Sequence, residues 1–290
     1  MTDVVTVVAV VEKRGRFWAA EPHFPSPRSG KDGRRSGGRR RIVLASNRVH
    51  GPGAGTVSAG ELVLVQLGGS GRGGDGKARV VRRIGRADVA RDAIEALMLD
   101  QGLAREFEPA VSEAAERARE QGMAAAMCEV QEGRRRDLRE LATLTIDPAS
   151  AQDFDDAISA QRLEGDGDVR VWVHIADVSA YVVEGSVVDR EARRRGTSVY
   201  APGAVEPMLP QALSNDACSL VPGVQRAAVT VELDLRGAKV VRSAFYRSLI
   251  RSDIRLDYEQ VDRVFAGQER AEDPWARPLA AAREASAALG

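Results

Sequence analysis

Four aspartates, Asp147, Asp153, Asp155 and Asp156, lie within ten residues of one another in the segment TIDPASAQDFDDA. Carboxylates this dense repel one another, so folding them together costs free energy unless protons or cations neutralise them. Ligand sets made only of oxygen favour Mg²⁺ or Mn²⁺ over zinc. Two such ions, about 3.5–4 Å apart, activate a water molecule and stabilise the leaving oxygen of a phosphodiester. The spacing therefore points to metal-dependent phosphodiester chemistry.

The cluster has simpler explanations. An exposed acidic turn is one, because aspartate-rich turns are common. An EF-hand is another, but the glycine and the closing glutamate that such a loop requires are absent. If the segment is extended, Asp153 and Asp155 share a face. A turn could then bring Asp156 inward, with Asp147 reaching back from a preceding strand.

The first part of the chain has the pattern of a small β-barrel. Short apolar runs, separated by stretches rich in glycine, proline and serine, predict strands at 4–11, 16–20, 41–45, 61–67 and 77–86. Five short strands within residues 1–86 match the size of an oligonucleotide-binding (OB) or cold-shock-like barrel. A small β-sandwich remains open as an alternative.

The rest of the chain changes pattern twice. Residues 87–136 have helical spacing and predict a helical linker. Residues 137–290 mix both kinds of element and predict an α/β domain, with strands at 169–177 and 227–235, a hairpin partner after the second strand, and helices near 184–195, 257–266 and the C-terminal alanine-rich run.

Charge is distributed unevenly along a chain of zero net charge. Residues 1–50 hold eleven Lys and Arg against four Asp and Glu. Within this basic stretch, Phe17 and Trp18 follow Arg16, and aromatic side chains among basic ones are typical of proteins that bind single-stranded nucleic acid. Packing inside a barrel explains the two aromatic residues equally well.

Composition excludes several other classes of protein. The sequence has two cysteines, Cys128 and Cys218, which lie far apart in the chain. Because there is no CxxC pair, the sequence does not indicate a zinc knuckle. The N-terminal apolar run is too short for a signal peptide, and no stretch approaches the length of a membrane span. We therefore expect a cytoplasmic protein that contacts no membrane.

Longer stretches of sequence resemble the ribonuclease II and ribonuclease R family, whose shared catalytic domain is called RNB. The matching runs follow the family's order: LRELATLTIDPASAQDFDDAIS, VWVHIADVSAYV, DREARRRGTSVYAPGAVEPMLPQALSNDACSLVPG and FYRSLIRSDIRLDYEQV. Where members often read SNGLCSL, this chain has SNDACSL at 214–220. The barrel resembles a diverged cold-shock domain more weakly.

The resemblance implies an activity and roles for individual residues. It implies a 3′→5′ exoribonuclease that binds the 3′ ends of single-stranded RNA and releases nucleoside 5′-monophosphates with Mg²⁺. By the same resemblance, Asp147 and Asp156 hold the first Mg²⁺, Asp155 is closest to the chemical step and Asp153 supports the site. Tyr200, in TSVYAPG, matches the tyrosine that orients the terminal nucleotide.

Two further motifs are weighed and set aside. Residues 71–77 nearly spell a P-loop, but Ala78 follows where Ser or Thr is needed and a strand follows where a helix is needed, so we expect no nucleoside triphosphate site. His174 and Asp177 could form a general-base pair. A satisfied core histidine is the favoured interpretation, because His174 lies in the apolar run VWVHIAD.

The expected fold class is therefore multidomain: a barrel, a helical linker and an incomplete RNB domain. We expect the 290-residue chain alone to be a weak or inactive nuclease. The alternatives are a non-catalytic RNA-binding protein with an RNB-like domain and a metal-dependent nuclease or phosphatase of another family. The sequence leaves the oligomeric state and the preferred RNA open.

Overall fold

A computed structural model of the chain describes residues 5–24, 41–50, 55–68, 78–103, 106–164 and 168–290. By its internal contacts the chain divides into two units, residues 1–106 with 198–206 and residues 107–197 with 207–290. No helix within the described ranges is long and apolar enough to cross a bilayer. The near-match to a P-loop at 71–77 lies outside the described residues.

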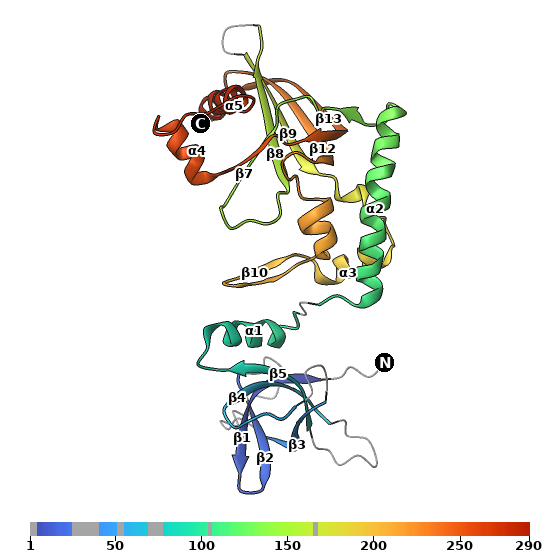
Figure 1. The fold of residues 1–290 in the computed structure, drawn as a ribbon, viewed down its shortest axis with the longest axis vertical. Coiled ribbons are helices and arrows are strands. Elements are labelled where there is room, and N and C mark those ends of the chain that lie inside the picture. The colour runs from blue at the N-terminus through green and yellow to red at the C-terminus, as the bar shows by residue number, and fades with distance from the viewer. Residues whose placement is uncertain (1–4, 25–40, 51–54, 69–77, 104–105, 165–167) are drawn as a thin grey trace, which may run out of the picture. The chain divides into compact units, whose positions relative to one another are not determined.

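The first unit is built on a closed barrel (Figure 1). Its strands follow one another around the barrel in the order β1-β2-β3-β5-β4, with bounds β1 Thr6–Arg14, β2 Phe17–Pro22, β3 Ile42–Val49, β5 Ala78–Arg86 and β4 Glu61–Gln66. Neighbouring strands are antiparallel except β3 and β5, which run parallel. The predicted five-stranded barrel is confirmed, and the sandwich alternative is wrong.

The unbroken apolar run of β1 has a physical reason. Ala9 and Val11 face the barrel interior, whereas Val8 packs with Leu62 and Ala96 in a second cluster. Ala96 belongs to helix α1 (Ala90–Asp100), which packs on the outside of the barrel. Because β1 is covered on both faces, its sequence does not alternate between apolar and polar residues.

The region predicted as a separate linker is divided between the two units. Helix α1 packs on the barrel, whereas α2 (Pro109–Gln131) packs in the core of the second unit through Val111, Ala115 and Ala126. The two helices bury small side chains and so become parts of the two cores. A short hairpin, β10 (Val199–Ala201) with β11 (Ala204–Glu206), groups with the first unit by its contacts.

The second unit is built on a seven-stranded mixed sheet (Figure 1). Its spatial order is β14 (Ile254–Asp257), β7 (Leu144–Asp147), β8 (Asp156–Arg162), β9 (Asp168–Ala176), β12 (Gln225–Arg236), β13 (Lys239–Arg251) and β6 (Arg136–Asp137). The outermost pairs, β14 with β7 and β13 with β6, are parallel, and the inner pairs are antiparallel. The predicted strands at 169–177 and 227–235 and the hairpin after them are confirmed as β9, β12 and β13.

Helices cover the sheet in three clusters of buried side chains. The predicted helices are confirmed as α3 (Val187–Arg195), α4 (Tyr258–Phe265) and α5 (Ala276–Leu289), and η2 (Ala212–Ala217) is a π-helical segment. α5 packs on β8, β9 and β12 through its small residues, α4 packs beside β7 and β14, and α2, α3 and η2 surround Phe154. The strands that carry the aspartates are therefore supported on both sides.

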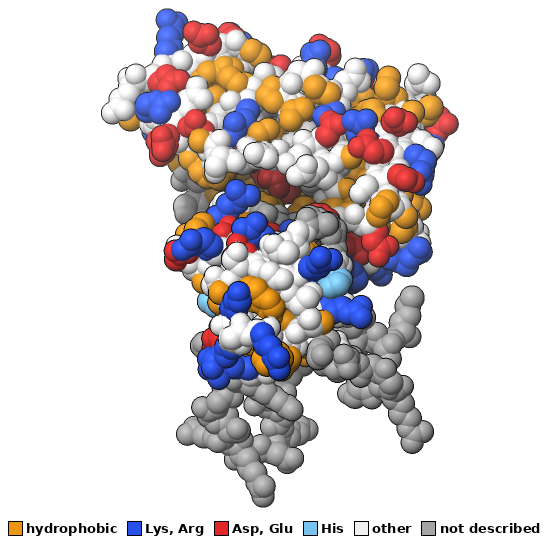
Figure 2. All heavy atoms as spheres, turned by 60° about the horizontal axis from the view of Figure 1, so that its bottom comes forward, with side chains coloured by type: hydrophobic (Ala, Val, Ile, Leu, Met, Phe, Trp, Pro, Cys, Tyr) orange, Lys and Arg blue, Asp and Glu red, His pale blue; other side chains and the backbone are white. Residues whose placement is uncertain are grey.

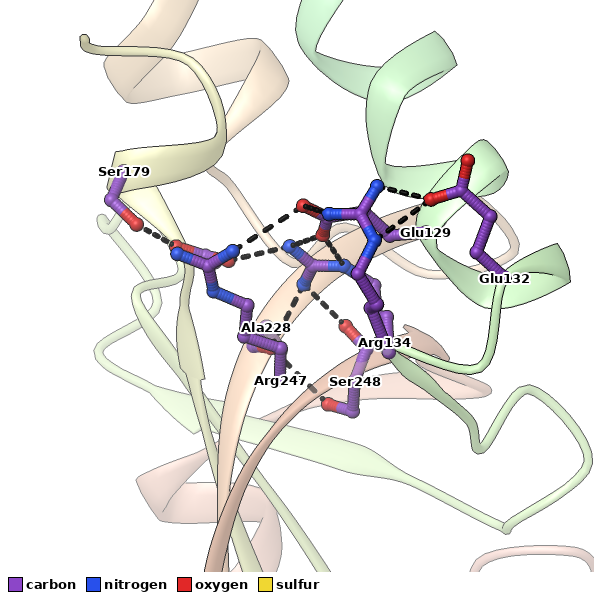
Figure 3. Close-up of polar contacts among 9 residues, drawn as sticks. Glu129, Glu132, Arg134, Ser179, Ala228, Arg247 and Ser248 are labelled. Carbon is purple, nitrogen blue, oxygen red and sulfur yellow. Dashed lines mark hydrogen bonds and ion pairs between the residues drawn. The ribbon is translucent and has the colours of Figure 1, made fainter.

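A buried ion-pair network ties the end of α2 to the sheet (Figure 3). Nη2 of Arg135 lies 2.7 Å from Oδ2 of Asp177 and 3.0 Å from Oε2 of Glu129. Its Nη1 donates to the carbonyl oxygens of Ser248, at 2.9 Å, and Ala228, at 3.2 Å. The side chains of Arg135 and Asp177 are each 1% exposed.

Candidate active site

The four aspartates lie on two adjacent strands and on the loop that joins them. Asp147 ends β7, Asp156 begins β8, and Asp153 and Asp155 lie in the connecting segment, which we call the aspartate loop (residues 148–155). β7 is hydrogen-bonded to β8 on one side and to β14 on the other, so its end is held firmly. The four residues predicted as metal ligands thus lie on two neighbouring strands and their connecting loop, near enough for the charges of Asp153 and Asp156 to act on Asp147 and Asp155.

Backbone hydrogen bonds hold the second half of the aspartate loop. The amide of Leu220 donates to the carbonyl oxygen of Phe154, and the amide of Ala176 to that of Asp155, both at 2.8 Å. Phe154 is buried in the core, whereas Asp153 is half-buried and Asp155 is exposed. The buried phenylalanine therefore anchors the two aspartates that flank it.

Burial, and after it the neighbouring carboxylates, raises the pKa values of two of the aspartates. Burial raises the pKa of Asp147, and the charges of Asp156 and Asp153 raise it further. The cationic side chain of Arg255 opposes this rise. Desolvation by the surrounding protein also raises the pKa of Asp155, although that residue reaches solvent, and the charges of Asp153 and Asp156 add to the effect. Negative charge is therefore concentrated here, and Arg255 offsets only part of its effect on the pKa of Asp147.

The donor chemistry of the cluster suits Mg²⁺ or Mn²⁺. Oδ2 of Asp147 is buried and has no hydrogen-bond partner in the described structure, which is costly for a carboxylate oxygen. Within the described ranges, no group of three or more acidic, histidine or cysteine side chains is already arranged to hold a metal ion. The four aspartates therefore supply suitable ligands without forming a preassembled cage, and a cation would satisfy the oxygen of Asp147 that lacks a partner.

The residues predicted to contact RNA lie in the first unit. Tyr200 is on β10 and is 65% exposed. Phe17 begins β2 and is 61% exposed, with the guanidinium of Arg16 5.2 Å from its ring centroid. Trp18 is half-buried against the barrel core, and Nζ of Lys13 lies 5.5 Å from its ring. Phe17 therefore presents an open aromatic face, whereas Trp18 also serves in packing.

Arg255, on β14, is the site residue that the sequence analysis missed. Its Nη2 donates to the carbonyl oxygens of Pro148 and Ala149, and its guanidinium lies 4.9 Å from the ring of Phe154. The signal was present, because Arg255 falls within one of the runs that resemble the ribonuclease family. Nothing in its spacing, however, shows that β14 lies beside β7.

The RNB domain is the family model that matches this chain, over residues 135–290, which is more than half of its length. The chain belongs to the RNB-domain family. The matched residues contain the whole aspartate cluster and the sheet that holds it. The resemblance noted in the sequence is thus confirmed.

Other RNB-domain proteins give the extent of the match. Ribonuclease R of Thermotoga maritima is 51% identical over 129 residues, covering 44% of this chain and 18% of that protein. Ribonuclease R of Escherichia coli is 43% identical over 141 residues, covering 48% and 17%. Ribonuclease R of Chlamydia pneumoniae is 40% identical over 182 residues, covering 62% and 26%. This chain spans about a quarter or less of the length of these relatives.

Two solved structures share the fold of this chain. Ribonuclease R of Mycoplasma genitalium, in complex with ribose-methylated single-stranded RNA, has a TM-score of 0.74 over 99% of this chain and 42% of its own, at 23% identity. A yeast pseudonuclease has a TM-score of 0.60 over 99% of this chain and 34% of its own, at 16% identity. At these identities the likeness concerns the fold alone.

His174 is a satisfied core residue of this RNB domain. It is fully buried; its Nδ1 lies 2.8 Å from Oγ1 of Thr230, and its Nε2 lies 3.1 Å from Oγ of Ser159. Asp177, the partner that a general-base pair would need, is bonded to Arg135 instead. The interpretation as a core histidine is confirmed. Burial lowers the pKa of His174 to about 4, so the ring is neutral near pH 7.

The buried ring predicts a pH dependence of stability. His174 titrates at about 4 in the folded chain and near 6.5 when unfolded. The unfolded state therefore binds the proton first as the pH falls, so stability is full above pH 6.5 and is lost towards pH 4. Between pH 7.5 and pH 5 the loss is about 2 kcal/mol. His174→Gln, which cannot titrate, should show a flatter profile by that amount in urea unfolding of the second unit.

The comparison isolates His174, because Asp147 and Asp155 titrate in wild type and variant alike. His50→Gln, at an exposed position of the first unit, is the matched control, because the transition that is measured belongs to the second unit. Parallel pH profiles for wild type and His174→Gln would contradict the prediction.

Proposed function

We propose that this chain is part of a 3′→5′ exoribonuclease that hydrolyses RNA phosphodiesters to nucleoside 5′-monophosphates. One observation carries the proposal: the cluster of four aspartates on β7, on β8 and in the aspartate loop, inside the residues that match the RNB domain. The relatives named ribonuclease R support it. We place the enzyme in the cytoplasm, with the 3′ ends of single-stranded RNA as its partner.

In the proposed mechanism, Asp147 and Asp156 would hold the first Mg²⁺ or Mn²⁺. Asp153 would support the site, and Asp155 would be the aspartate most tightly bound to the chemical step. When bound, such ions supply an activated water and neutralise charge on the phosphate. The chain's own part is to hold its carboxylates in place: Asp147 by the end of a paired strand, and Asp153 and Asp155 by the buried anchor between them.

A non-catalytic RNA-binding protein is the alternative. The fold does not separate the two, because a yeast pseudonuclease shares it. The aspartates favour the enzyme, since all four are present and Asp147 keeps a buried carboxylate oxygen without a protein partner. A chain that had lost metal chemistry would have no use for such uncompensated charge.

We also propose that the barrel is of the OB or cold-shock type and guides RNA. The order β1-β2-β3-β5-β4 and its size support this assignment. On the face of the first unit turned to the viewer in Figure 2, Lys and Arg side chains lie around exposed apolar ones. We assign Arg16 and Phe17, with Trp18 behind them, to backbone and base contacts. Tyr200 is proposed to stack on the terminal nucleotide.

Phe17→Ala is expected to weaken binding of single-stranded RNA by about 1–3 kcal/mol, because base–aromatic stacking is lost. The salt dependence should stay unchanged, since stacking releases no counterions, whereas Arg16→Ala should lower the salt slope by roughly one. The measurement is fluorescence anisotropy of a labelled oligoribonucleotide in EDTA at several salt concentrations. Phe245→Ala, which removes a phenylalanine 72% exposed in the second unit, is the matched control. Equal affinities for the two variants would leave the barrel without this role.

The proposed function is tested with a polypeptide of the relatives' length that carries this sequence, beside the 290-residue chain itself. The substrate is an oligoribonucleotide labelled at its 5′ end, with Mg²⁺. The long enzyme should shorten the RNA stepwise from its 3′ end and release nucleoside 5′-monophosphates. We expect the 290-residue chain to be weak or inactive, because Arg255, the cation that acts on Asp147 in the described residues, is already bonded to the carbonyl oxygens of Pro148 and Ala149 and is not available to the developing phosphate charge. Internal cleavage, or release from the 5′ end, would refute the assignment.

A further inference from the structure

β14 brings Arg255 to the side of the strand that carries Asp147. The two strands run parallel, with Arg255 in register with Thr145 and Asp257 in register with Asp147. Because side chains alternate along a strand, Arg255 and Asp147 face the same side of this sheet edge. The neighbouring Leu256 lies in the hydrophobic core, so the register of Arg255 is fixed by packing.

Arg255 connects the two ends of the aspartate loop. Its Nη2 lies 2.9 Å from the carbonyl oxygen of Pro148 and 2.9 Å from that of Ala149, the first two residues of the loop. Its guanidinium carbon lies 4.9 Å from the ring centroid of Phe154, near the end of the loop. A planar guanidinium serves this arrangement well, because it donates in a fixed geometry and stacks on an aromatic face at once.

The contacts of Arg255 complement those of the backbone. Backbone amides from outside the loop pin Phe154 and Asp155 in its second half. In the first half, the carbonyl oxygen of Pro148 accepts a bond from the amide of Ala151, which lies within the loop, and Arg255 binds the carbonyl oxygens of Pro148 and Ala149 from the neighbouring strand. The loop that links Asp147 to the other carboxylates is thus held from both sides, against the repulsion among those carboxylates.

We infer that Arg255 is a positioning residue that holds the aspartate loop in the shape that receives a divalent cation. The inference rests on the proposed function, because it assumes that the aspartates bind metal. It adds a residue that acts through its contacts with the loop rather than through contact with RNA. Asp257, which is in register with Asp147, has a different role: its side chain accepts a hydrogen bond from the amide of Gln260 and caps α4.

The direction in which Mn²⁺ affinity changes when Arg255 is replaced distinguishes a positioning role from a purely electrostatic one. A cation beside the site repels a second cation, so removal of the charge alone would strengthen binding of Mn²⁺. Loss of the loop's shape would weaken it, and groups that orient metal ligands are typically worth about 10–100-fold in metal affinity. Arg255→Met should therefore weaken Mn²⁺ binding about tenfold or more. Arg255→Lys keeps the charge but loses the planar stacking, and should weaken binding by less.

The experiment titrates the 290-residue chain with Mn²⁺ alone and follows free Mn²⁺ by electron paramagnetic resonance. Amide hydrogen exchange of residues 149–155 is measured in parallel without metal, and should be faster in Arg255→Met. The matched control is Arg162→Met, which removes an arginine paired with the exposed Glu284 at the other end of β8 from Asp156. It should change neither measurement.

The outcomes separate the inference from the function it rests on. Mn²⁺ binding by Arg255→Met that equals or exceeds that of wild type would overturn the positioning role alone. If wild type does not bind Mn²⁺, or if Asp155→Asn does not remove that binding, the proposed metal site is wrong. The inference about Arg255 then fails with it. If Arg255→Met does not fold, Arg255→Lys decides: weaker Mn²⁺ binding with faster loop exchange supports the role, and unchanged values overturn it.

Discussion

Replacing Asp155 with asparagine is expected to abolish release of mononucleotides from RNA while leaving RNA binding nearly intact. The substitution keeps the shape of the side chain but removes one negative charge from the aspartate cluster. Because metal chemistry on a phosphate contributes several kcal/mol, we expect a loss of rate on the order of 10³-fold. RNA affinity should change little, because the proposed backbone and base contacts lie in the first unit.

Two assays test the two halves of this expectation, in a polypeptide of the relatives' length. Single-turnover hydrolysis with Mg²⁺ measures the chemical step, and a gel shift in EDTA measures binding. Asp137→Asn is the control, because it removes a surface carboxylate, paired with Arg139, from the same unit. Hydrolysis by Asp155→Asn within a few-fold of wild type would remove Asp155 from the chemical step.

The large elements of the fold could be read from local patterns. The strands around 169–177 and 227–235 are long and apolar, and both are buried at the centre of the sheet as β9 and β12. The barrel strands were predicted within a few residues, because each is bounded by loop-forming residues. Local patterns do not predict the parallel pairing of β3 with β5, because these two strands are not neighbours in the sequence.

The elements that make the site were the hardest to predict. β7 and β14 have four residues each, and β8 reads DAISAQR, which has little of the β-branched or aromatic character that marks a strand. These segments form strands because hydrogen bonding to neighbouring strands holds them in an extended conformation. Their pairing brings Arg255 to Pro148, 107 positions away along the chain.

The aspartate cluster itself could be recognised from type and spacing, but its electrostatics could not. The residue types and spacing do not show which of the four aspartates is buried. In the structure Asp147 is buried and Asp155 is exposed. Burial follows from the position of Asp147 at the end of β7, which lies between β14 and β8 in the sheet. A linear pattern cannot show which carboxylate oxygen lacks a partner, because that depends on every group packed around it.

The second large effect is expected at Arg135, which is paired with Asp177 and Glu129. Arg135→Met should lower the free energy of unfolding of the second unit by about 3–5 kcal/mol, because it leaves the carboxylate of Asp177 buried without its cation. Burial pushes the pKa of Asp177 up, but the hydrogen bonds from Ser179 and Arg135, together with the charges of Arg135 and Arg247, outweigh burial and leave that pKa lowered. A carboxylate that depends on these partners for its charge has most to lose when one is removed.

The neighbouring residue supplies a matched control. Arg134 is 61% exposed and pairs at the surface with Glu132, which is 55% exposed; it also reaches Glu129, which keeps Arg135 and Arg247 as partners when Arg134 is removed. Pairs of this kind contribute about 0–1 kcal/mol, since water already solvates both charges. Arg134→Met therefore removes the same side chain, one position earlier, with a small expected cost.

Urea unfolding of wild type, both single variants and the double variant Arg135→Met with Asp177→Asn measures the network directly. The double variant should be more stable than the sum of its two single changes predicts, because it leaves no unpaired charge inside the protein. Additive costs would mean that Arg135 and Asp177 act independently, in spite of the 2.7 Å between their side chains. An Arg135→Met variant as stable as Arg134→Met would show that the buried pair contributes no more than a surface one, and that apolar packing alone fixes the end of α2 against β12 and β13.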